Sequence, residues 1–375
     1  MWKREWKDKH HEDDKRRQEH RKNGSHENER NEPGQNGNER RGKRNDHHEE
    51  KYDGNFLQVK DLVVEYTSGG QVIHAVNKVS LELDRGETLG LVGETGAGKT
   101  TICKAILRIL PNPPAKIRSG EILMAGRDLM KKSERDMLHI RGGKIAMIFQ
   151  DPMTALNPVM SVGSQISEVV MLHSHCSGEE AKERTVRMLE MVGIPAERYV
   201  EFPHQFSGGM KQRVVIAMAL ACDPQLLLAD EPTTALDVTI QAQVLEMINE
   251  LKKKFNTAMI LVTHDLGVVG ETCDKVAIIY AGEIVETGTK EDIFLRTAHP
   301  YTEGLFDSVP KMNDESKRLA PIPGLPPDPT NLPEGCVFHP RCKYATDECR
   351  KSKIEMQEVS HGHFCRCIHH VRQEE

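Results

Sequence analysis

Residues 93–100 read Gly93-Glu94-Thr95-Gly96-Ala97-Gly98-Lys99-Thr100, which fits the pattern G-x-x-x-x-G-K-[ST] of a phosphate-binding loop. An apolar run, Leu89 to Val92, precedes the loop, and a helical pattern, Thr100 to Leu110, follows it. The glycines let the backbone wrap around a polyphosphate with its N–H groups pointing inward, and the helix start adds positive partial charge. We therefore predict a nucleoside triphosphate site in which Lys99 contacts the β- and γ-phosphates.

A second apolar run, Leu226 to Ala229, ends in two acidic residues, Asp230 and Glu231. Such a run is typical of a buried parallel strand that delivers side chains to the carboxyl edge of a sheet, where nucleotides bind. We predict that Asp230 binds Mg²⁺ together with Thr100, because hard cations prefer oxygen ligands. Glu231 is then placed to orient or deprotonate the attacking water.

Two further apolar runs end in polar residues whose meaning is less specific. Residues 145–149 lead to Gln150, which offers a neutral oxygen to Mg²⁺ or to water. Residues 258–263 lead to His264, which is placed to contact the γ-phosphate. Taken alone, His264 is equally well an ordinary histidine at a strand end.

Composition limits the class of protein. The chain has 375 residues and a formal net charge of −6, which gives no sign of a nucleic-acid surface. Its apolar stretches are far shorter than the roughly 18 residues needed to span a bilayer, and its charged N-terminus does not resemble a signal peptide. We expect a soluble, cytoplasmic protein whose membrane role runs through a partner.

Residues 1–53 differ from the rest, because the only apolar residues among the first 50 are Met1, Trp2 and Trp6. Such a segment cannot bury enough apolar surface to offset its ordering entropy. We expect a charged, disordered tail. A histidine-rich metal-binding tract and a tether to lipid headgroups remain as alternatives.

The order of the motifs resembles the nucleotide-binding subunit of an ABC transporter. The motifs are Gly93–Thr100, Gln150, Ser207-Gly208-Gly209, Asp230-Glu231, Ala235-Leu236-Asp237 and His264. The closer resemblance, over about residues 56–365, is to the D-type ATPases of oligopeptide/dipeptide permeases, and residues 147–158, 206–213 and 230–238 carry it. Relative to the common signature motif, Phe206 replaces Leu and Met210 replaces Gln, and we expect neither to remove activity.

This resemblance implies an α/β P-loop NTPase core with a mostly parallel sheet and an antiparallel β-region. It also implies an α-helical subdomain at about residues 151–222 and a small Cys-rich C-terminal module. The predicted boundaries are a tail over residues 1–53, an ABC ATPase domain over 54–305 and a Pro/Cys-rich module over 306–375.

The resemblance further implies that two ATPase subunits face each other head to tail. ATP would lie between residues 93–101 of one subunit, including Thr101, and Ser207, Gly208 and Gly209 of the other, with Asp237 also contacting nucleotide. Tyr66, in an alternating strand-like stretch, would stack on adenine or else be an ordinary strand aromatic. Residues 153–168 would dock a membrane subunit.

The implied partners are two membrane-spanning permease subunits, a second related ATPase subunit in a heterodimer, and, indirectly, an extracytoplasmic solute-binding protein. We therefore expect ATP hydrolysis that powers peptide import from the cytoplasmic face of the membrane. An importer of nickel or another small solute is the alternative. A non-transport ABC ATPase is more distant, because the chain has one cassette, no internal repeat and no long heptad run.

Five of the nine cysteines fall in the last 40 residues: Cys336, Cys342, Cys349, Cys365 and Cys367. Four thiolates suffice for a structural Zn²⁺ or an iron–sulfur cluster, although the absence of a C-x2-C pair weakens the zinc reading. The family resemblance favours a [4Fe–4S] cluster held by Cys336, Cys342, Cys349 and Cys365, with Cys367 a near neighbour. The choice of Cys365 over Cys367 as the fourth ligand rests on spacing alone. Zinc and a metal-free cysteine-rich lid remain open. We expect the other four cysteines to be buried apolar residues.

Overall fold

The computed structural model describes residues 55–234, 236–308 and 321–371. The tail predicted for residues 1–53 lies outside the described residues. In the described ranges, no helix is both long and apolar enough to cross a membrane.

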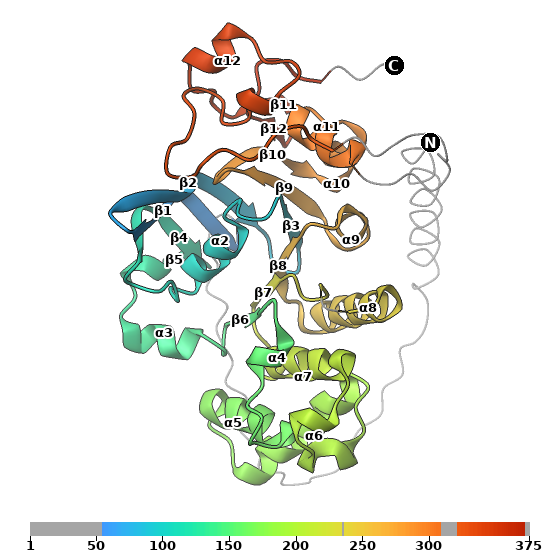
Figure 1. Ribbon diagram of the computed structural model, residues 1–375. Helices are drawn as coiled ribbons and strands as arrows, with labels where there is room; N and C mark the ends of the chain where they lie inside the picture. The colour runs from blue at the N-terminus through green and yellow to red at the C-terminus, as the bar shows by residue number, and fades with distance from the viewer. Residues whose placement is uncertain (1–54, 235, 309–320, 372–375) are drawn as a thin grey trace, which may run out of the picture. The chain divides into compact units, whose positions relative to one another are not determined.

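Within the described residues, the larger of two sheets has eight strands in the order β11-β12-β10-β9-β3-β8-β7-β6 (Figure 1). Strands β6, β7, β8, β3 and β9 are parallel, and β10, β12 and β11 add antiparallel strands to one edge. Their bounds are β3 Thr88–Val92, β6 Ile145–Ile148, β7 Leu226–Asp230, β8 Ala258–Thr263, β9 Lys275–Tyr280, β10 Glu283–Thr289, β11 Gln357–Ser360 and β12 His363–Cys365. Every residue of β3, β7 and β8 is buried, as their continuous apolar runs predict for central parallel strands. The predicted parallel α/β core is confirmed.

The smaller sheet is antiparallel, with the strand order β2-β1-β4-β5. Its strands are β1 Leu57–Ser68, β2 Gln71–Leu83, β4 Ala115–Met124 and β5 Arg127–Asp128. Burial alternates along much of β1, because one face of the strand packs on the core and the other face is more open. This alternation is typical of an antiparallel strand. This sheet is the predicted antiparallel β-region.

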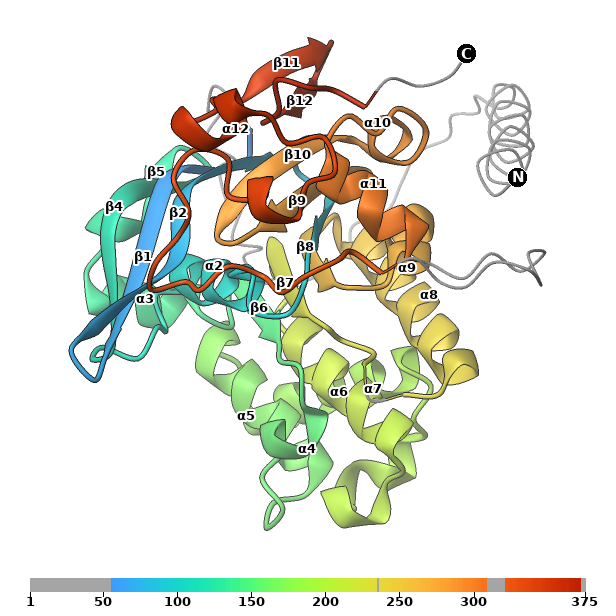
Figure 2. The ribbon, with the colours of Figure 1, turned by 45° about the horizontal axis from the view of Figure 1, so that its top comes forward.

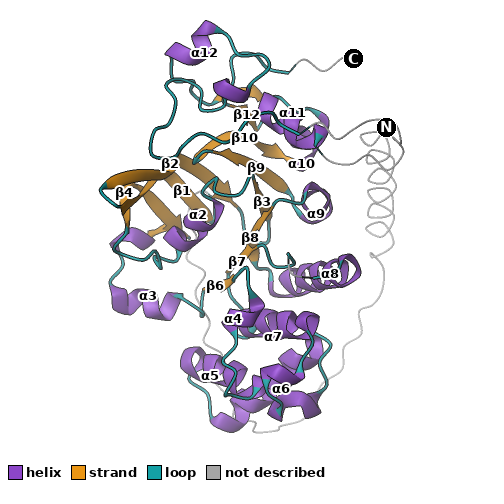
Figure 3. Ribbon diagram, viewed as in Figure 1, coloured by secondary structure: helices purple, strands orange, loops and turns teal. Residues whose placement is uncertain are grey.

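Residues 152–220 form a group of helices next to β6 (Figure 3). It comprises α4 Pro152–Ala155, α5 Val162–Ser174, α6 Gly178–Met191, the 3-10 turns η2 Ala196–Val200 and η3 Pro203–Gln205, and α7 Gly208–Leu220. Serine side chains cap α5, α6 and α7 through the N–H groups of the first turn.

The remaining helices flank the sheets. They are α2 Lys99–Ile106, the 3-10 turn η1 Leu129–Lys131, α3 Glu134–Ile140, α8 Val238–Phe255, α9 Leu266–Thr272, α10 Lys290–Leu295, α11 Pro300–Asp307, the 3-10 turn η4 His339–Arg341 and α12 Asp347–Lys351. Helix α2 ends earlier than the predicted Leu110, because Arg108 adopts a φ of +53° and Pro111 follows.

The C-terminal segment, residues 321–371, does not form a module of its own, so that part of the predicted architecture is not supported. Strand β12 pairs with β10, with Cys365 opposite Glu286, and β11 pairs with β12. Glu286 is fully buried, and its carboxylate lies 2.9 Å from Nε2 of His363. The segment is therefore an extension of the main sheet, fixed to it by a buried polar pair.

The nine cysteines are all free. Of the four outside the C-terminal segment, Cys103 and Cys273 are buried as expected, whereas Cys176 and Cys222 are only half-buried.

Candidate nucleotide site

The phosphate-binding loop connects β3 to α2, with Gly98 at the N-cap of α2 in a left-handed conformation, φ +104°. A side chain at residue 93 would have its Cβ 2.1 Å from the Ile279 carbonyl oxygen of β9. One at residue 98 would lie 2.4 Å from the Ala75 carbonyl oxygen of β2. Glycine is therefore required at both positions, because the loop packs directly on neighbouring backbone.

Lys99 lies under the loop with its side chain almost fully buried. Its ammonium donates hydrogen bonds to the Gly93 carbonyl at 2.7 Å and the Glu94 carbonyl at 3.0 Å. Burial lowers the pKa of Lys99, although Glu231, Asp230 and Glu94 act in the opposite direction. A desolvated ammonium with carbonyl partners at a helix N-terminus is suited to binding an anion.

The loop and strand β7 meet at a side-chain contact. The Thr100 hydroxyl donates to the Asp230 carboxylate at 3.1 Å. Asp230 is buried at the end of β7, and burial raises the pKa of its carboxyl. A hydroxyl and a carboxylate side by side in this setting offer oxygen ligands to a hard cation. The structure thus brings together two of the predicted Mg²⁺ ligands.

Glu231 has a φ of +47°, and its backbone N–H donates to the Val262 carbonyl at 2.9 Å. Its carboxylate accepts hydrogen bonds from the Gln150 amide at 2.9 Å and the Thr234 hydroxyl at 3.0 Å, and His264 Nδ1 lies 3.4 Å away. Burial opposes ionisation, but the bonds from Thr234 and His264 lower the pKa of Glu231 below its usual range. The group is an ionised carboxylate that can accept a proton, in a backbone conformation that costs about 1–3 kcal/mol.

The structure places Tyr66 on β1, half-buried, with its hydroxyl 3.4 Å from the Thr101 hydroxyl at the start of α2. Its ring therefore lies beside the first turn of that helix. This position is compatible with either predicted role, stacking on a base or packing as a strand residue.

The structure does not bring Ser207, Gly208 and Gly209 to the phosphate-binding loop. Ser207 caps α7, its hydroxyl accepting from the Met210 N–H at 3.4 Å. Within the described ranges, no hydrogen bond links residues 207–209 to residues 93–101. Asp237 is exposed at the start of α8 and makes no capping bond. Ser207, Gly208 and Asp237 are exposed, so these groups are open to contact from outside the chain.

Besides Thr234, side chains from distant segments that the sequence did not single out contact the site. The Tyr301 hydroxyl accepts from the Glu94 N–H at 3.0 Å, and the Arg341 guanidinium binds the Glu94 carboxylate at 2.8 and 3.1 Å. The buried Gln212 amide of α7 donates to the Pro232 carbonyl at 2.5 Å, directly after Glu231. No local pattern signals these contacts, because each joins residues that are far apart in sequence.

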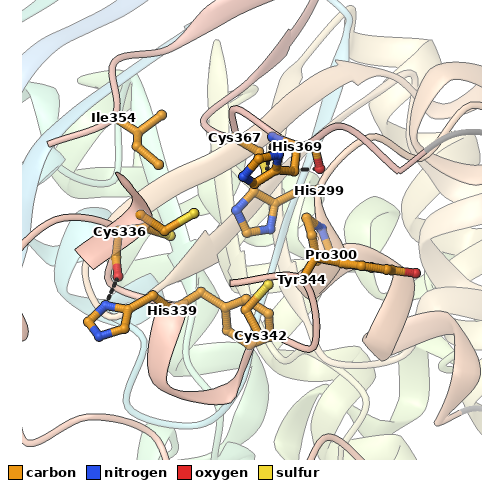
Figure 4. A pocket seen from close by; sticks show the side chains of 11 residues that line it. His299, Pro300, Cys336, His339, Cys342, Tyr344, Ile354, Cys367 and His369 are labelled. Carbon is orange, nitrogen blue, oxygen red and sulfur yellow. Dashed lines mark hydrogen bonds between the residues drawn. The ribbon is translucent and has the colours of Figure 1, made fainter. Parts of the chain in front are cut away.

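Four cysteines line a pocket at the C-terminal segment: Cys336, Cys342, Cys349 and Cys367 (Figure 4). Cys365, the fourth ligand predicted from the sequence, is not among them. It is fully buried beside Ala298 and Cys367. Burial raises the pKa of Cys336 to about 11 and that of Cys367 to about 12.

His299 also lines this pocket and is buried. Its Nδ1 accepts from the Tyr301 N–H at 3.0 Å, so Nε2 carries the proton in the neutral ring, and among the described residues this N–H finds no hydrogen-bond partner. Burial lowers the pKa of His299 to about 4. The four thiols are of the ligand type that thiolate-bound metal groups use, whereas a protonated Nε2 is a hydrogen-bond donor and not a ligand. The described residues nevertheless include no three His, Cys, Asp or Glu side chains arranged to hold a metal ion.

Comparisons with known proteins match the arrangement described above. A family model described as ABC transporter matches residues 76–234, and one described as oligopeptide/dipeptide transporter, C-terminal region, matches residues 285–349. The oligopeptide transport ATP-binding protein OppD of Bacillus subtilis (strain 168) is 52% identical over 312 residues, covering 82% of this chain and 87% of that protein. The dipeptide transport ATP-binding protein DppD of the same organism is 50% identical over 288 residues, covering 76% and 86%.

Solved structures give the same result for the core. The ATP-binding cassette MJ0796, in a dimeric post-hydrolysis state bound to ADP and Pi, superposes with a TM-score of 0.57 at 27% identity. The superposition covers 62% of this chain and 98% of the MJ0796 chain. CbiO1 from Clostridium perfringens, part of the ABC transporter complex cbiONQ, has a TM-score of 0.57 at 27% identity, covering 65% and 92%. This chain is therefore an ABC ATPase and belongs to the family of oligopeptide and dipeptide transport ATP-binding proteins.

Proposed function

We propose that the chain hydrolyses ATP to power the import of peptides through separate permease subunits. The names of its relatives support the substrate class, as does the match of residues 285–349 to the C-terminal region of oligopeptide/dipeptide transporters. The observation that carries the ATPase chemistry is the contact of Thr100 with Asp230 beside the ionised Glu231 carboxylate.

In this proposal the residues divide the work of phosphoryl transfer. Lys99 and the N–H groups of residues 95, 96 and 98–101 bind the phosphates, whereas the N–H groups of Glu94 and Ala97 have partners within the chain. Thr100, Asp230 and Gln150 would hold Mg²⁺, which would neutralise charge on the phosphates. Glu231 accepts the proton of the attacking water. His264 both keeps that carboxylate ionised and contacts the γ-phosphate. Tyr66 stacks on the adenine.

We further propose that Ser207, Gly208, Gly209 and Asp237 act on the nucleotide of a second, related ATPase subunit. Ser207, Gly208 and Asp237 are exposed, and in the described ranges residues 207–209 make no hydrogen bond to the chain's own phosphate-binding loop, which supports this role. The heterodimer would sit on the cytoplasmic face of the membrane, with residues 153–168 docked on the permease subunits. An extracytoplasmic binding protein would deliver the peptide.

The peptide assignment is tested in cells that lack this chain and are complemented with either the parent or Glu231→Gln. Uptake of a labelled oligopeptide and of radioactive Ni²⁺ is measured in parallel. The proposal predicts that the parent restores peptide uptake and that the Glu231→Gln variant does not. Restoration of Ni²⁺ uptake without peptide uptake would replace it with the small-solute importer.

The cysteine pocket supports a finer proposal, that Cys336, Cys342, Cys349 and Cys367 hold an iron–sulfur cluster or Zn²⁺. Such a group would crosslink segments far apart in sequence. Iron, sulfide and zinc are measured in the full chain purified without oxygen, and Cys367→Ser is compared with Cys365→Ser. Cys367→Ser should lose the metal and Cys365→Ser should keep it. Metal-free parent protein, or loss only in Cys365→Ser, would contradict this ligand set.

A further inference from the structure

The second residue of the phosphate-binding loop, Glu94, is held from three sides. Its N–H donates to the Tyr301 hydroxyl, and its carbonyl accepts from the Lys99 ammonium. Its carboxylate receives two hydrogen bonds from Arg341, Nη1 to Oε2 at 2.8 Å and Nη2 to Oε1 at 3.1 Å. Two of these three partners come from beyond residue 300, outside the segments that carry the ATPase motifs.

Arg341 reaches the loop from the C-terminal segment. That segment passes next to β2, where the Pro329 carbonyl accepts from the His74 N–H (Figure 2). The Arg341 side chain is only 6% exposed, and it also donates to the carbonyls of Ile322 and Pro323 and to the Tyr280 hydroxyl. Arginine is suited to this place, because its planar fork binds a carboxylate with two parallel bonds while its other N–H groups find acceptors.

The charge of Glu94 gives this contact a consequence for the nucleotide. A free carboxylate in the loop would repel a triphosphate at short range and would do so strongly in a partly buried site. Arg341 is the cation bonded directly to this carboxylate, whereas Lys99 contacts the carbonyl of Glu94 and acts on its charge only from a distance. Removal of one partner from such a buried pair leaves the other uncompensated.

We propose that Arg341 is a positioning residue for ATP binding: it fixes and neutralises Glu94, and so couples the C-terminal segment to the phosphate-binding loop. Arg341 does not touch the reacting atoms. It acts through Glu94, and it makes nucleotide affinity depend on correct folding of a segment 247 residues downstream.

The test measures MgATP affinity of the full-length chain at low and high salt, with thermal unfolding of the nucleotide-free protein as the folding control. Arg341→Met should weaken MgATP binding about tenfold, equivalent to about 1.4 kcal/mol. The loss of affinity should be smaller at high salt, because salt screens the repulsion between the uncompensated Glu94 carboxylate and the triphosphate. The double variant Glu94→Gln/Arg341→Met should return to within about threefold of the parent, because both charges are gone.

The matched control is Arg366→Met. Arg366 lies in the same segment and also donates to backbone carbonyls, those of Ile284 and Ile354, but does not contact the loop. It should leave MgATP affinity unchanged. An equal loss of affinity in Arg366→Met would mean that the segment acts only through stability and would overturn the proposal.

Two further results would overturn it. One is an affinity of Arg341→Met within about twofold of the parent, and the other is a double variant that stays as weak as Arg341→Met. Glu94→Gln alone removes the carboxylate but keeps the Arg341 guanidinium, so it should bind MgATP about threefold more tightly than the parent, because the uncompensated positive charge attracts the triphosphate. A tenfold loss in Glu94→Gln would overturn the proposal even if Arg341→Met failed to fold.

Discussion

The chain presents two glycine-rich helix N-termini, at α2 and at α7, and they differ in what surrounds them. At α2 the same chain supplies the Lys99 ammonium, the hydroxyl of Thr100 bonded to the Asp230 carboxylate, and next to Asp230 the carboxylate of Glu231. At α7, Ser207 and Gly208 are exposed, and the neighbouring side chains serve to hold the turn. Both ends suit an anion, but only the first also has the groups for a cation and a proton acceptor.

This difference indicates how the work is divided. The N-terminus of α2 is the centre of a site that one chain can build alone. The N-terminus of α7 offers donors without a catalytic group, which is what the proposed action on a partner's nucleotide requires. Variants at the two ends should therefore separate binding from turnover.

The largest effect is expected at α2, for Lys99→Ala. The buried ammonium provides a charged hydrogen-bond donor, and such bonds contribute about 1.5–3 kcal/mol, so MgATP affinity should fall on the order of tenfold to a hundredfold. Hydrolysis should be abolished. Equilibrium binding of a fluorescent ATP analogue measures the affinity, and unchanged affinity would remove Lys99 from the site.

At α7, Ser207→Asp should break turnover without breaking binding. Aspartate caps a helix as well as serine does, so the fold should be kept, while its charge should repel a phosphate. The isolated chain should bind MgATP like the parent, and ATP hydrolysis by the assembled transporter should fall about tenfold or more. Ser207→Thr, which keeps the hydroxyl, is the control. Equal turnover in Ser207→Asp and the parent would show that this end does not contact nucleotide.

The smallest effect on turnover is expected for Arg198, which contacts residues on both sides of the α7 N-terminus. Its guanidinium lies 4.3 Å from the Phe206 ring centroid and donates to the Gln205 carbonyl and to the Met210 sulfur. Arg198→Met should lower turnover about two- to fivefold by loosening the turn, with MgATP affinity unchanged.

The control for Arg198→Met is Arg187→Met. Arg187 is exposed, and among the described residues its charge pairs only with Glu183 on its own helix. Turnover assays of the assembled transporter compare the two variants. If both variants lower turnover equally, the effect of Arg198 does not come from its contacts at the α7 N-terminus.

The α2 site and its contact with Arg341 differ in whether the sequence could predict them. The α2 site could be predicted because its loop is contiguous and because buried parallel strands end at one sheet edge, which places Asp230 beside Thr100. Arg341 could not be predicted, because its contact with Glu94 depends on how the C-terminal segment returns past β2.

The fourth pocket cysteine shows the same limit. Cys365 and Cys367 are two residues apart and would share a face in a continuous strand. Strand β12 ends at Cys365, however, and only Cys367 lines the pocket. Spacing alone cannot distinguish the two, because the decisive feature is where the strand ends.

In the proposed mechanism the α2 end binds ATP and Glu231 drives its hydrolysis. The most direct measurement compares MgATP affinity and steady-state phosphate release for the parent and Glu231→Gln in the assembled transporter. We predict parent-like affinity and a turnover reduced on the order of 10² to 10⁴, the usual contribution of a general base. Turnover close to that of the parent would contradict it.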